Sequence, residues 1–414
     1  MNIELLTIGS ELLLGFTVDT NGAELARALS AVGVQVVRRT SVGDDSEAIR
    51  RAVLEALGRT GAVLTTGGLG PTRDDVSKVV VAELFGAPLE FDEAVWQALV
   101  ERFARMGRTP PASNRSQAQV PRGATVLPNR WGTAPGLWLE GPPGLAIMLP
   151  GVPGEMRKLM EHEVVPRLAA RSDGAVIRSR LVRTTGIPES TLAERLGEIE
   201  QAIAPLSLAY LPGYEGVDLR VSAWRLPAAE ADARLAAATA LLRQRAGQYA
   251  YGEGDDDLAA LVLESARARR LSLGTAESCT GGLVAARLTE IPGSSDVFIG
   301  AVVCYANALK TSLLEVDPEL IAADGAVSES VARAMARGAC RRLGVDVAVA
   351  VTGIAGPAGG TASKPVGTVW LALAQGDEVE ARRLQIPGDR HNVRVRSAQA
   401  ALQLLWRRLA QSPA

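Results

Sequence analysis

The chain has 414 residues, of which 47% are hydrophobic and 22% are charged, and its formal net charge is −2. This length exceeds that of one typical domain, so we expect two or three, and the near-neutral charge supplies no overall basic field to recruit nucleic acid. The three cysteines, Cys279, Cys304 and Cys340, match neither a disulfide framework nor a zinc-site spacing.

The first region, residues 1–170, alternates predicted strands with predicted helices. The strands are Ile3–Ile8, Val34–Arg39 and Gly61–Thr65, and the helices are Asn21–Val32 and Ser46–Leu57, the latter capped by Ser46. This alternation predicts a mainly parallel sheet with helices on both faces, which binds ligands beyond the carboxyl ends of its strands. Met1 leads directly into the first strand without a signal-peptide pattern, and no apolar run is long enough to span a bilayer, so we expect a cytoplasmic protein.

The middle region, residues 171–252, has a different pattern. Its predicted strands are Arg178–Thr185 and Gly216–Leu226, and its predicted helices are Glu189–Ile203 and Ala228–Ala246. These elements indicate a small α+β domain, followed by an acidic, glycine-containing linker at Tyr249–Asp257.

From residue 258 to residue 414 the strand–helix alternation returns. A helix runs to Arg269, a strand covers Leu271–Thr275, another helix starts near Thr280, and a further strand covers Val345–Val351. The fold class that we predict is therefore α/β, with two separate α/β domains of mainly parallel sheets joined by the small α+β domain.

A first candidate site lies at Gly67–Asp75, where a predicted strand ends. Gly67, Gly68 and Gly70 let the backbone approach a phosphate closely, Thr72 adds a hydroxyl, and Asp74 or Asp75 could hold a divalent cation. In the alternative interpretation, the two carboxylates lie in the first turn of a helix, where each stabilises the helix dipole by ~0.3–1 kcal/mol. Glu11 and Asp19-Thr20-Asn21 are expected at the same sheet edge and favour a site.

This first region resembles the molybdopterin-binding, MoaB/MogA-like fold. The resemblance is carried by Gly9–Gly15, Asp19-Thr20-Asn21, Gly67–Asp75 and Pro150–Met156. The same residues more closely resemble the N-terminal domain of the CinA (competence/damage-inducible protein A) family. That resemblance implies divalent-metal-dependent hydrolysis of ADP-ribose rather than pterin binding. It makes Asp74, Asp75 and Glu11 candidate metal ligands, with Gly67, Gly68, Gly70 and Thr72 around phosphate.

A second candidate site lies in Thr275–Gly282, Thr-Ala-Glu-Ser-Cys-Thr-Gly-Gly. Ser278 stands between a predicted strand and a predicted helix start, where backbone donors would stabilise an oxyanion. With no histidine nearby, Lys310 is the candidate base, and Tyr305 could relay or position the proton. The alternatives are that Ser278 is an N-cap and Lys310 a solvated helix residue. Cys279 is interpreted as a small buried residue rather than as a nucleophile.

A third turn, Val351–Gly360, places Thr352, Gly353 and Gly356 after an apolar strand. A loop this rich in glycine that emerges from a buried strand favours ligand binding over a plain surface loop, and it is not a Walker A motif. Arg390 and Arg394 have i, i+4 spacing on the last predicted helix, which suits phosphate binding; an ordinary solvated arginine face is the alternative.

Together these C-terminal segments closely resemble the CinA C-terminal domain, which also occurs alone as the nicotinamide mononucleotide deamidase PncC. The resemblance implies hydrolysis of the carboxamide of nicotinamide mononucleotide to nicotinate mononucleotide and ammonia, without a cofactor. It implies that Thr280, Gly281 and Gly282 contact substrate and leaves Ser295 as a rival nucleophile to Ser278. Two residues depart from the family pattern, Ala306 in place of serine and Ala358 in place of glycine.

The middle region resembles the KH-like insert of full-length CinA proteins. Its single candidate Gly-x-x-Gly loop, Gly213-Tyr214-Glu215-Gly216, carries an acidic residue, so we do not expect direct nucleic-acid binding and interpret the domain as structural or dimerising. We expect a homodimer. Three functions remain open: a bifunctional pyridine-nucleotide salvage hydrolase, a competence or DNA-repair interaction protein, and a pterin-binding N-terminal domain fused to a deamidase.

Overall fold

The computed structural model describes residues 1–171 and 175–411. These form two compact units, one of Met1–Arg178 with Ser222–Arg234 and the other of Ser179–Val221 with the chain from Leu235 onward. The boundary crosses the middle region, whose long strands and helix contribute residues to both units. Within the described residues, no helix combines the length and the hydropathy needed to cross a membrane.

A mixed sheet in the order β2-β1-β3-β8-β7-β6 forms the centre of the N-terminal unit. Its strands are β1 (Asn2–Ile8), β2 (Gln35–Val42), β3 (Ala62–Thr66), β6 (Thr125–Leu127), β7 (Gly136–Gly141) and β8 (Gly144–Leu149). The first four strands in the sheet order are parallel, and β7 and β6 extend the sheet antiparallel. The parallel part is the one that carries the predicted site residues.

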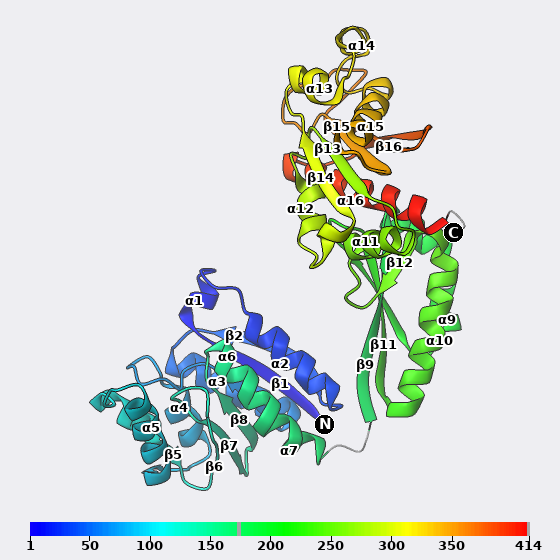
Figure 1. Ribbon diagram of the computed structural model, residues 1–414. Coiled ribbons are helices and arrows are strands. Elements are labelled where there is room, and N and C mark those ends of the chain that lie inside the picture. The colour runs from blue at the N-terminus through cyan, green and yellow to red at the C-terminus, as the bar shows by residue number, and fades with distance from the viewer. Residues whose placement is uncertain (172–174, 412–414) are drawn as a thin grey trace. The chain divides into compact units, whose positions relative to one another are not determined.

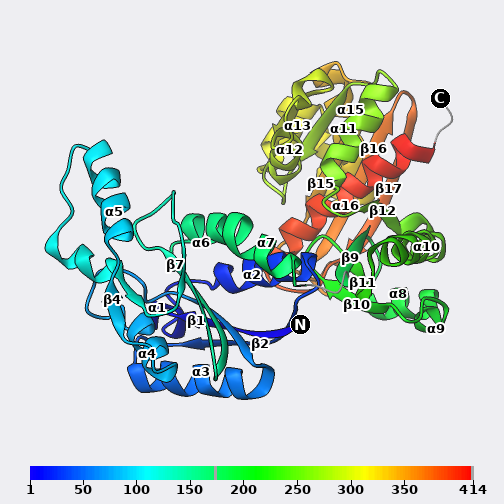
Figure 2. The same ribbon diagram turned by 90° about the horizontal axis from the view of Figure 1, so that it is seen from below.

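Helices cover both faces of this sheet, as predicted. On one face lie α2 (Thr20–Ala31), α6 (Pro153–Leu159), a π-helical turn (Met160–Val164) and α7 (Val165–Ala169), and on the other α3 (Ser46–Thr60) and α4 (Ser77–Leu84) (Figure 2). Ile3 and Leu5 of β1 face the first layer, while Leu6 faces the second, because side chains alternate along a strand. The cap of α3 is Asp45, which accepts from the N–H of Ala48, so the prediction of Ser46 was wrong by one residue.

The remaining elements of this unit lie beside the sheet. They are α1 (Ser10–Leu13), β4 (Leu89–Phe91), α5 (Glu93–Arg105), a 3-10 helix (Ala112–Ala118) and β5 (Gln119–Pro121), with β4 and β5 paired antiparallel.

The middle region folds as a sheet in the order β10-β11-β9-β12 with helices, which confirms an α+β lobe. Its elements are β9 (Ala175–Thr184), α8 (Glu189–Leu196), α9 (Ile199–Ala202), β10 (Ser207–Pro212), β11 (Val217–Pro227), α10 (Ala228–Ala246), a 3-10 turn (Gly247–Tyr249) and β12 (Ala250–Glu253). The helix predicted as continuous is interrupted at Gly197, whose φ is 58°. The segment predicted as a linker was wrong in part, because β12 pairs with β9.

The C-terminal domain is built on a sheet in the order β14-β13-β15-β16-β17. Its strands are β13 (Leu273–Glu277), β14 (Phe298–Val303), β15 (Val347–Gly353), β16 (Thr368–Gln375) and β17 (Glu378–Gln385). The first three strands in the sheet order are parallel, and β16 and β17 are antiparallel. The predicted α/β class is thus confirmed for both ends of the chain, with an antiparallel extension in each sheet.

The helices of this domain also form two layers. They are α11 (Leu258–Ala268), α12 (Leu283–Thr289), a 3-10 turn (Ser294–Asp296), α13 (Asn307–Leu314), α14 (Pro318–Asp324), α15 (Glu329–Leu343) and α16 (Arg390–Gln411). Apolar side chains of α11, α12 and α16 pack on one face and those of α15 on the other. The long α16, red in Figure 1, runs against α11 and closes the first layer.

Candidate active sites

The structure brings Ser278 and Lys310 together in the C-terminal domain. Ser278 directly follows β13, and Lys310 is on α13, which follows β14, so both lie at the carboxyl ends of neighbouring parallel strands. The Lys310 Nζ donates to the Ser278 Oγ at 3.1 Å and to the carbonyl oxygens of Cys304 at 3.0 Å and Tyr305 at 3.4 Å. The pair is removed from solvent, with 1% of Lys310 and 7% of Ser278 exposed.

The surroundings of Lys310 make its neutral form easier to reach than that of an exposed lysine. Burial lowers the pKa of Lys310, because a charged ammonium loses its hydration there. Among the described residues no carboxylate forms an ion pair with this lysine, so nothing in that part of the chain offsets the loss in the way that a salt bridge would. A neutral amine next to a hydroxyl is the arrangement that a serine nucleophile without histidine requires.

The carboxylate of Glu277 occupies the N-terminus of α12. Glu277 is fully buried and accepts hydrogen bonds from the N–H groups of Gly282 at 2.9 Å, Val284 at 3.1 Å and Ala285 at 2.9 Å. The helix begins at Leu283, so the predicted start near Thr280 was wrong. Ser278 does not cap it, so the alternative interpretation of this serine as an N-cap was also wrong. The N–H groups of Gly282, Val284 and Ala285 are therefore already used and are not available to an oxyanion.

The backbone of the turn itself is also partly used. The Ser278 N–H donates to the carbonyl of Val351 at 2.9 Å, and the Gly281 N–H donates to that of Ser278 at 3.2 Å. Gly281 and Gly282 have φ values of 64° and 94°, left-handed conformations that glycine adopts at low cost. These two glycines thus shape the turn that presents the Ser278 hydroxyl. Sequence reasoning missed the role of Glu277; an acidic residue at a strand end, four positions before a glycine pair, was the available signal.

A small cavity of about 270 Å³ opens in front of the Ser278–Lys310 pair. Its lining residues are Ser278, Cys279, Tyr305, Asn307, Lys310, Ala326, Val327, Thr352, Gly353, Ala355 and Arg390. It therefore contains each of the predicted catalytic residues except Ser295. Its volume lies just below the range of about 300–1,000 Å³ that is usual for drug-sized ligands, so it fits a single ring and its substituents.

Polar contacts fix the wall of this cavity. Arg390 donates from Nη2 to the Tyr305 hydroxyl oxygen at 3.0 Å and from Nη1 to the carbonyl of Gly356 at 2.8 Å. The Thr352 hydroxyl donates to the carbonyl of Ala326 at 2.8 Å. Because the Thr352 proton is directed at the backbone, its oxygen is left as an acceptor toward the cavity.

Two predicted site residues lie outside the cavity, whereas Cys279 is buried as predicted. Arg394 does not line the cavity; it donates to the carbonyl of Thr280 at 3.0 Å and so supports the turn. Ser295 lies in the 3-10 turn just before β14, at the amino end of that strand, and the structure does not bring it to Lys310. Burial raises the pKa of the Cys279 thiol to about 12, which disfavours the thiolate near neutral pH.

Asn307 is a cavity residue that sequence reasoning missed. It is the first residue of α13, and it lines the cavity together with Lys310, three positions later on the same helix. Its amide offers both a donor and an acceptor to a ligand. The i, i+3 spacing from the candidate base was the signal that could have found it.

The Gly-x-x-Gly loop of the middle lobe, residues 213–216, lies against the C-terminal domain. Glu215 forms ion pairs with Arg183 at 3.1 Å and with Arg287 of α12 at 2.8 Å. The ring of Tyr214 stands edge-on to that of His391, with ring centroids 5.5 Å apart. These contacts give the acidic residue of the loop a structural role in holding the lobe to the domain.

In the N-terminal unit, the glycine turn at residues 67–75 follows β3. A Cβ atom would lie 2.1 Å from the Ile8 carbonyl oxygen at Gly67 and 1.9 Å from the Ser77 Oγ at Gly68. At Gly70 it would lie 2.4 Å from the Asp75 carboxylate. Gly67 and Gly68 are therefore required by the packing of the turn itself, whether or not a phosphate binds there, whereas Gly70 faces only the end of the Asp75 side chain.

The predicted carboxylates of this site differ in their surroundings. Asp75 accepts hydrogen bonds from both the N–H and the hydroxyl of Thr72, and it precedes α4 rather than lying in its first turn. Glu11 is exposed on α1. Among the described residues no group of three or more His, Cys, Asp or Glu side chains could hold a metal ion, so Glu11, Asp74 and Asp75 do not form a complete ligand set.

Other polar groups at the same sheet edge are partly unsatisfied. Asn21 donates to Thr66 at 3.3 Å and to the carbonyl of Gly151 at 2.7 Å, while its Oδ1 has no partner among the described residues. The Ser77 hydroxyl is likewise fully buried and unpartnered within the described chain. Groups of this kind are suited to a ligand that brings its own donors and acceptors.

Comparison with known families divides the chain into three segments. Residues 4–170 match the family described as "Probable molybdopterin binding domain", residues 179–252 match "Damage-inducible protein CinA KH domain", and residues 255–409 match "CinA C-terminal domain".

Relatives of known sequence cover nearly the whole chain. A "CinA-like protein" of Gemmatimonas aurantiaca is 54% identical over 99% of this chain and 97% of its own length. Another from Salinibacter ruber is 45% identical over 99% of this chain and 100% of its own length. The crystal structure of the competence/damage inducible protein CihA from Agrobacterium tumefaciens is 42% identical and covers 37% of this chain and 94% of that chain, with a TM-score of 0.36.

Proposed function

The chain belongs to the CinA family, and on that basis we propose that it is a bifunctional hydrolase of pyridine-nucleotide salvage. The C-terminal domain hydrolyses the carboxamide of nicotinamide mononucleotide to nicotinate mononucleotide and ammonia. The N-terminal unit is a divalent-metal-dependent ADP-ribose pyrophosphatase. The observation that carries the first activity is the buried hydrogen bond of 3.1 Å between Lys310 and Ser278 at the cavity wall.

In the first half of the reaction, the neutral amine of Lys310 accepts the hydroxyl proton of Ser278. The Ser278 Oγ then forms a bond to the carboxamide carbon, and the carbonyl π electrons move onto its oxygen. When this tetrahedral intermediate collapses, the C–N bond breaks, and the proton held by Lys310 passes to the leaving nitrogen, which departs as ammonia. The product is a nicotinate ester of Ser278.

In the second half, a water molecule takes the place of the departed ammonia. Lys310 accepts a proton from the water, the hydroxide oxygen bonds to the ester carbon, and the Ser278 oxygen leaves and takes the proton back. Tyr305 is a positioning residue, since its backbone carbonyl accepts from Lys310 and its hydroxyl accepts from Arg390. Because the first turn of α12 is occupied by Glu277, we assign the stabilisation of the oxyanion to donors around the cavity, with Asn307 as the side-chain candidate.

Arg390 suits the phosphate of the substrate. Its guanidinium is exposed at the rim of the cavity, and its two hydrogen bonds go to neutral acceptors, Tyr305 and the carbonyl of Gly356. No carboxylate among the described residues is paired with it, so its charge is available to an anion.

The residues of the N-terminal turn fit a divalent cation in part. Asp74 and Asp75 offer two carboxylates, and Mg²⁺ is commonly held by one or two carboxylates together with waters and substrate phosphates. When bound, the cation would neutralise the pyrophosphate charge. Asp74 and Asp75 would orient it, with Glu11 as a third candidate.

The match to a molybdopterin-binding description favours pterin binding as a second candidate for this unit. Titration calorimetry with ADP-ribose and with a pterin, each in the presence of Mg²⁺, separates the two. If the pterin gives a binding heat and ADP-ribose does not, the second candidate is correct.

The test of the C-terminal activity is incubation of the full chain with nicotinamide mononucleotide. We expect ammonia and nicotinate mononucleotide in equal amounts, and loss of both in Lys310→Ala. Lys364→Ala, which changes a lysine outside the cavity, is the matched control and should keep the wild-type rate. Full activity in Lys310→Ala would refute the proposed base.

A further inference from the structure

The N-terminal end of α16 carries two arginines that support the site around Ser278. Arg390 lies at the rim of the cavity, where its guanidinium donates to two neutral oxygens. Arg394, one helical turn later, donates to the carbonyl of Thr280 at 3.0 Å. Because both arginines stand on the same end of one helix, whatever fixes that end also fixes the positions of both.

This end of α16 also meets the middle lobe. His391 directly follows Arg390, and its ring lies edge-on to that of Tyr214, with 5.5 Å between the ring centroids and 82° between the ring planes. Tyr214 belongs to the loop at residues 213–216, which lies in the same compact unit as α16. Consecutive residues of a helix are about 100° apart around its axis, so His391 can contact the lobe while Arg390 faces the cavity.

The contact between the lobe and α16 continues along the helix as buried hydrogen bonds. The Gln399 amide donates to the Thr185 hydroxyl at 3.3 Å, and the Gln403 amide donates to the Thr185 carbonyl at 3.0 Å. All three residues are buried. Positions 391, 399 and 403 are separated by multiples of four and so lie on one side of the helix. The lobe therefore holds one side of α16 over about three helical turns.

The same loop is joined to α12, the helix that follows the candidate nucleophile. The carboxylate of Glu215 pairs with Arg287 of α12 at 2.8 Å, and the backbone carbonyl of Glu215 accepts from the Thr185 hydroxyl at 2.7 Å. Arg287 in turn donates to the side-chain oxygen of Gln399 at 3.4 Å. The loop, α12 and α16 are thus connected by one hydrogen-bonded network, which fixes the loop against the start of α16.

We infer that the middle lobe contributes to the binding of the substrate phosphate, because the ring of Tyr214 holds His391 and thereby positions Arg390 at the cavity rim. Tyr214 and His391 are positioning residues that do not touch the substrate. The inference rests on the proposed deamidase function and adds to it a role of the lobe in the affinity for phosphorylated ligands. Loss of the Tyr214 ring therefore weakens the binding of a nucleotide but not that of the corresponding nucleoside.

The test is calorimetric titration of the full chain with the proposed product, nicotinate mononucleotide, and with nicotinate riboside, which lacks the phosphate. We expect Tyr214→Ala and His391→Ala to weaken binding of the nucleotide by about 2–10-fold, the worth of one aromatic pair, and to leave binding of the nucleoside unchanged. Tyr214→Phe keeps the ring and should bind both ligands as the wild type does. In Tyr214→Ala the KM for nicotinamide mononucleotide should rise by the same factor at unchanged kcat.

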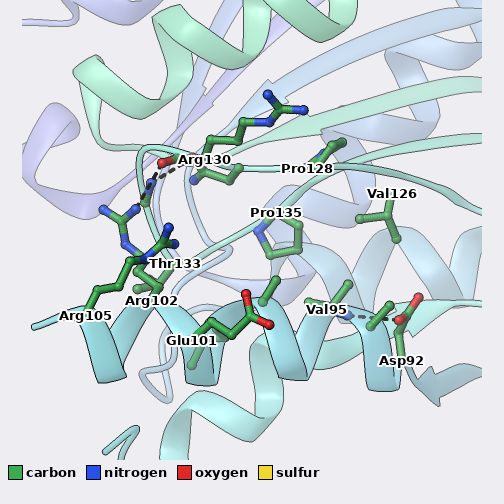
Figure 3. A pocket seen from close by; sticks show the side chains of 15 residues that line it. Asp92, Val95, Glu101, Arg102, Arg105, Val126, Pro128, Arg130, Thr133 and Pro135 are labelled. Carbon is green, nitrogen blue, oxygen red and sulfur yellow. Dashed lines mark hydrogen bonds between the residues drawn. The ribbon is translucent and has the colours of Figure 1, made fainter. Parts of the chain in front are cut away.

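A double-mutant cycle separates positioning from a general loss of structure. In the Arg390→Ala background, Tyr214→Ala should cause no further loss of nucleotide affinity, because the lobe acts through the arginine. Tyr210→Ala, on β10 of the same lobe, is the matched control for the tyrosine. Arg105→Ala is the control for the arginine; Arg105 lies at a cavity of about 460 Å³ between α5 and the chain segment 126–135 of the N-terminal unit (Figure 3). Both controls should bind the nucleotide as the wild type does.

Unchanged nucleotide affinity in Tyr214→Ala, or an equal loss of affinity for the nucleotide and the nucleoside, would overturn the inference. Failure of the wild type to bind the nucleotide would overturn it as well. If the nucleotide binds as expected but nicotinamide mononucleotide is not deamidated, only the proposed deamidase activity fails, and the role of the lobe in phosphate binding stands.

Discussion

The Lys310 Nζ lies 3.1 Å from the Ser278 Oγ, although 32 positions separate the two residues in the sequence. The parallel pairing of β13 and β14 produces this contact, because it places the residues that follow both strands at one edge of the sheet. The lysine is buried without a carboxylate partner among the described residues, a costly position unless its charge can be lost. These surroundings of Lys310 predict how both the reaction rate and the stability depend on pH.

The first prediction concerns the pH dependence of deamidation. Lys310 must be neutral to accept a proton, and burial lowers its pKa, so kcat should rise with pH and level off below the ordinary lysine value of about 10.5. A pH–rate profile of the full chain measures this directly. A rise that is complete only above pH 10.5 would show that Lys310 titrates as an exposed lysine and is not the base.

The same shift predicts a pH dependence of stability. The unfolded state binds more protons than the folded state between the lowered pKa of Lys310 and about 10.5, so the free energy of unfolding should rise with pH across that window. Lys310→Met should remove this contribution. Urea unfolding at several pH values tests this, with Lys364→Met as the control. The same dependence of the unfolding free energy on pH in the wild type, Lys310→Met and Lys364→Met would contradict the prediction.

Glu277 should be important for stability because its carboxylate is the N-terminal cap of α12. In Glu277→Gln an amide N–H₂ faces backbone N–H donors in the buried site, and we expect a loss of about 1–3 kcal/mol in the free energy of unfolding. Urea denaturation provides the measurement. Glu290→Gln, at the exposed other end of the helix, is the control, and equal midpoints for the two variants would argue against the capping role.

The ion pairs between the loop at residues 213–216 and the C-terminal domain predict how this loop responds to mutation. Glu215→Ala removes the partner shared by Arg183 and Arg287, and we expect a loss of about 1 kcal/mol, since Glu215 is partly exposed. Thermal unfolding followed by circular dichroism would detect it, with the exposed Glu189→Ala as control. If Glu215→Ala leaves the midpoint unchanged but confers binding to single-stranded RNA in an anisotropy assay, the loop is a nucleic-acid clamp instead.

Cys279 lines the cavity but should not react. Burial raises its thiol pKa to about 12, so the thiolate is scarce at neutral pH, and iodoacetamide should not inactivate the enzyme. Cys279→Ala should retain most of the deamidase activity. Rapid inactivation that substrate prevents, together with an inactive Cys279→Ala, would make the cysteine the nucleophile.

The sequence patterns predicted the layered α/β architecture because hydrophobic alternation and glycine turns are local signals. Ser278, Lys310, Tyr305, Thr352 and Arg390 could be selected because each stands at or near the end of a predicted strand or at the start of a helix. The start of α12 could not be placed, since it depends on hydrogen bonds from the N–H groups of Gly282, Val284 and Ala285 to the side chain of Glu277, which no propensity pattern marks.

Other features lay outside the reach of local patterns. The pairing of β12 with β9 depends on residues about seventy positions apart, so an acidic segment looked like a linker. The cavity beside α5 is formed by packing between α5 and segment 126–135, and none of its residues belongs to a recognisable motif. Such features depend on tertiary packing, which propensity alone does not determine.

The most direct test of the Ser278–Lys310 account compares two serines in the same domain. Ammonia release from nicotinamide mononucleotide is measured for Ser278→Ala and for Ser295→Ala, the second lying at the amino end of β14. We predict that Ser278→Ala lowers kcat by at least about 10²–10⁴-fold, the usual contribution of proton transfer alone, while Ser295→Ala keeps the wild-type rate. Wild-type turnover by Ser278→Ala, with loss of activity in Ser295→Ala, would contradict the account.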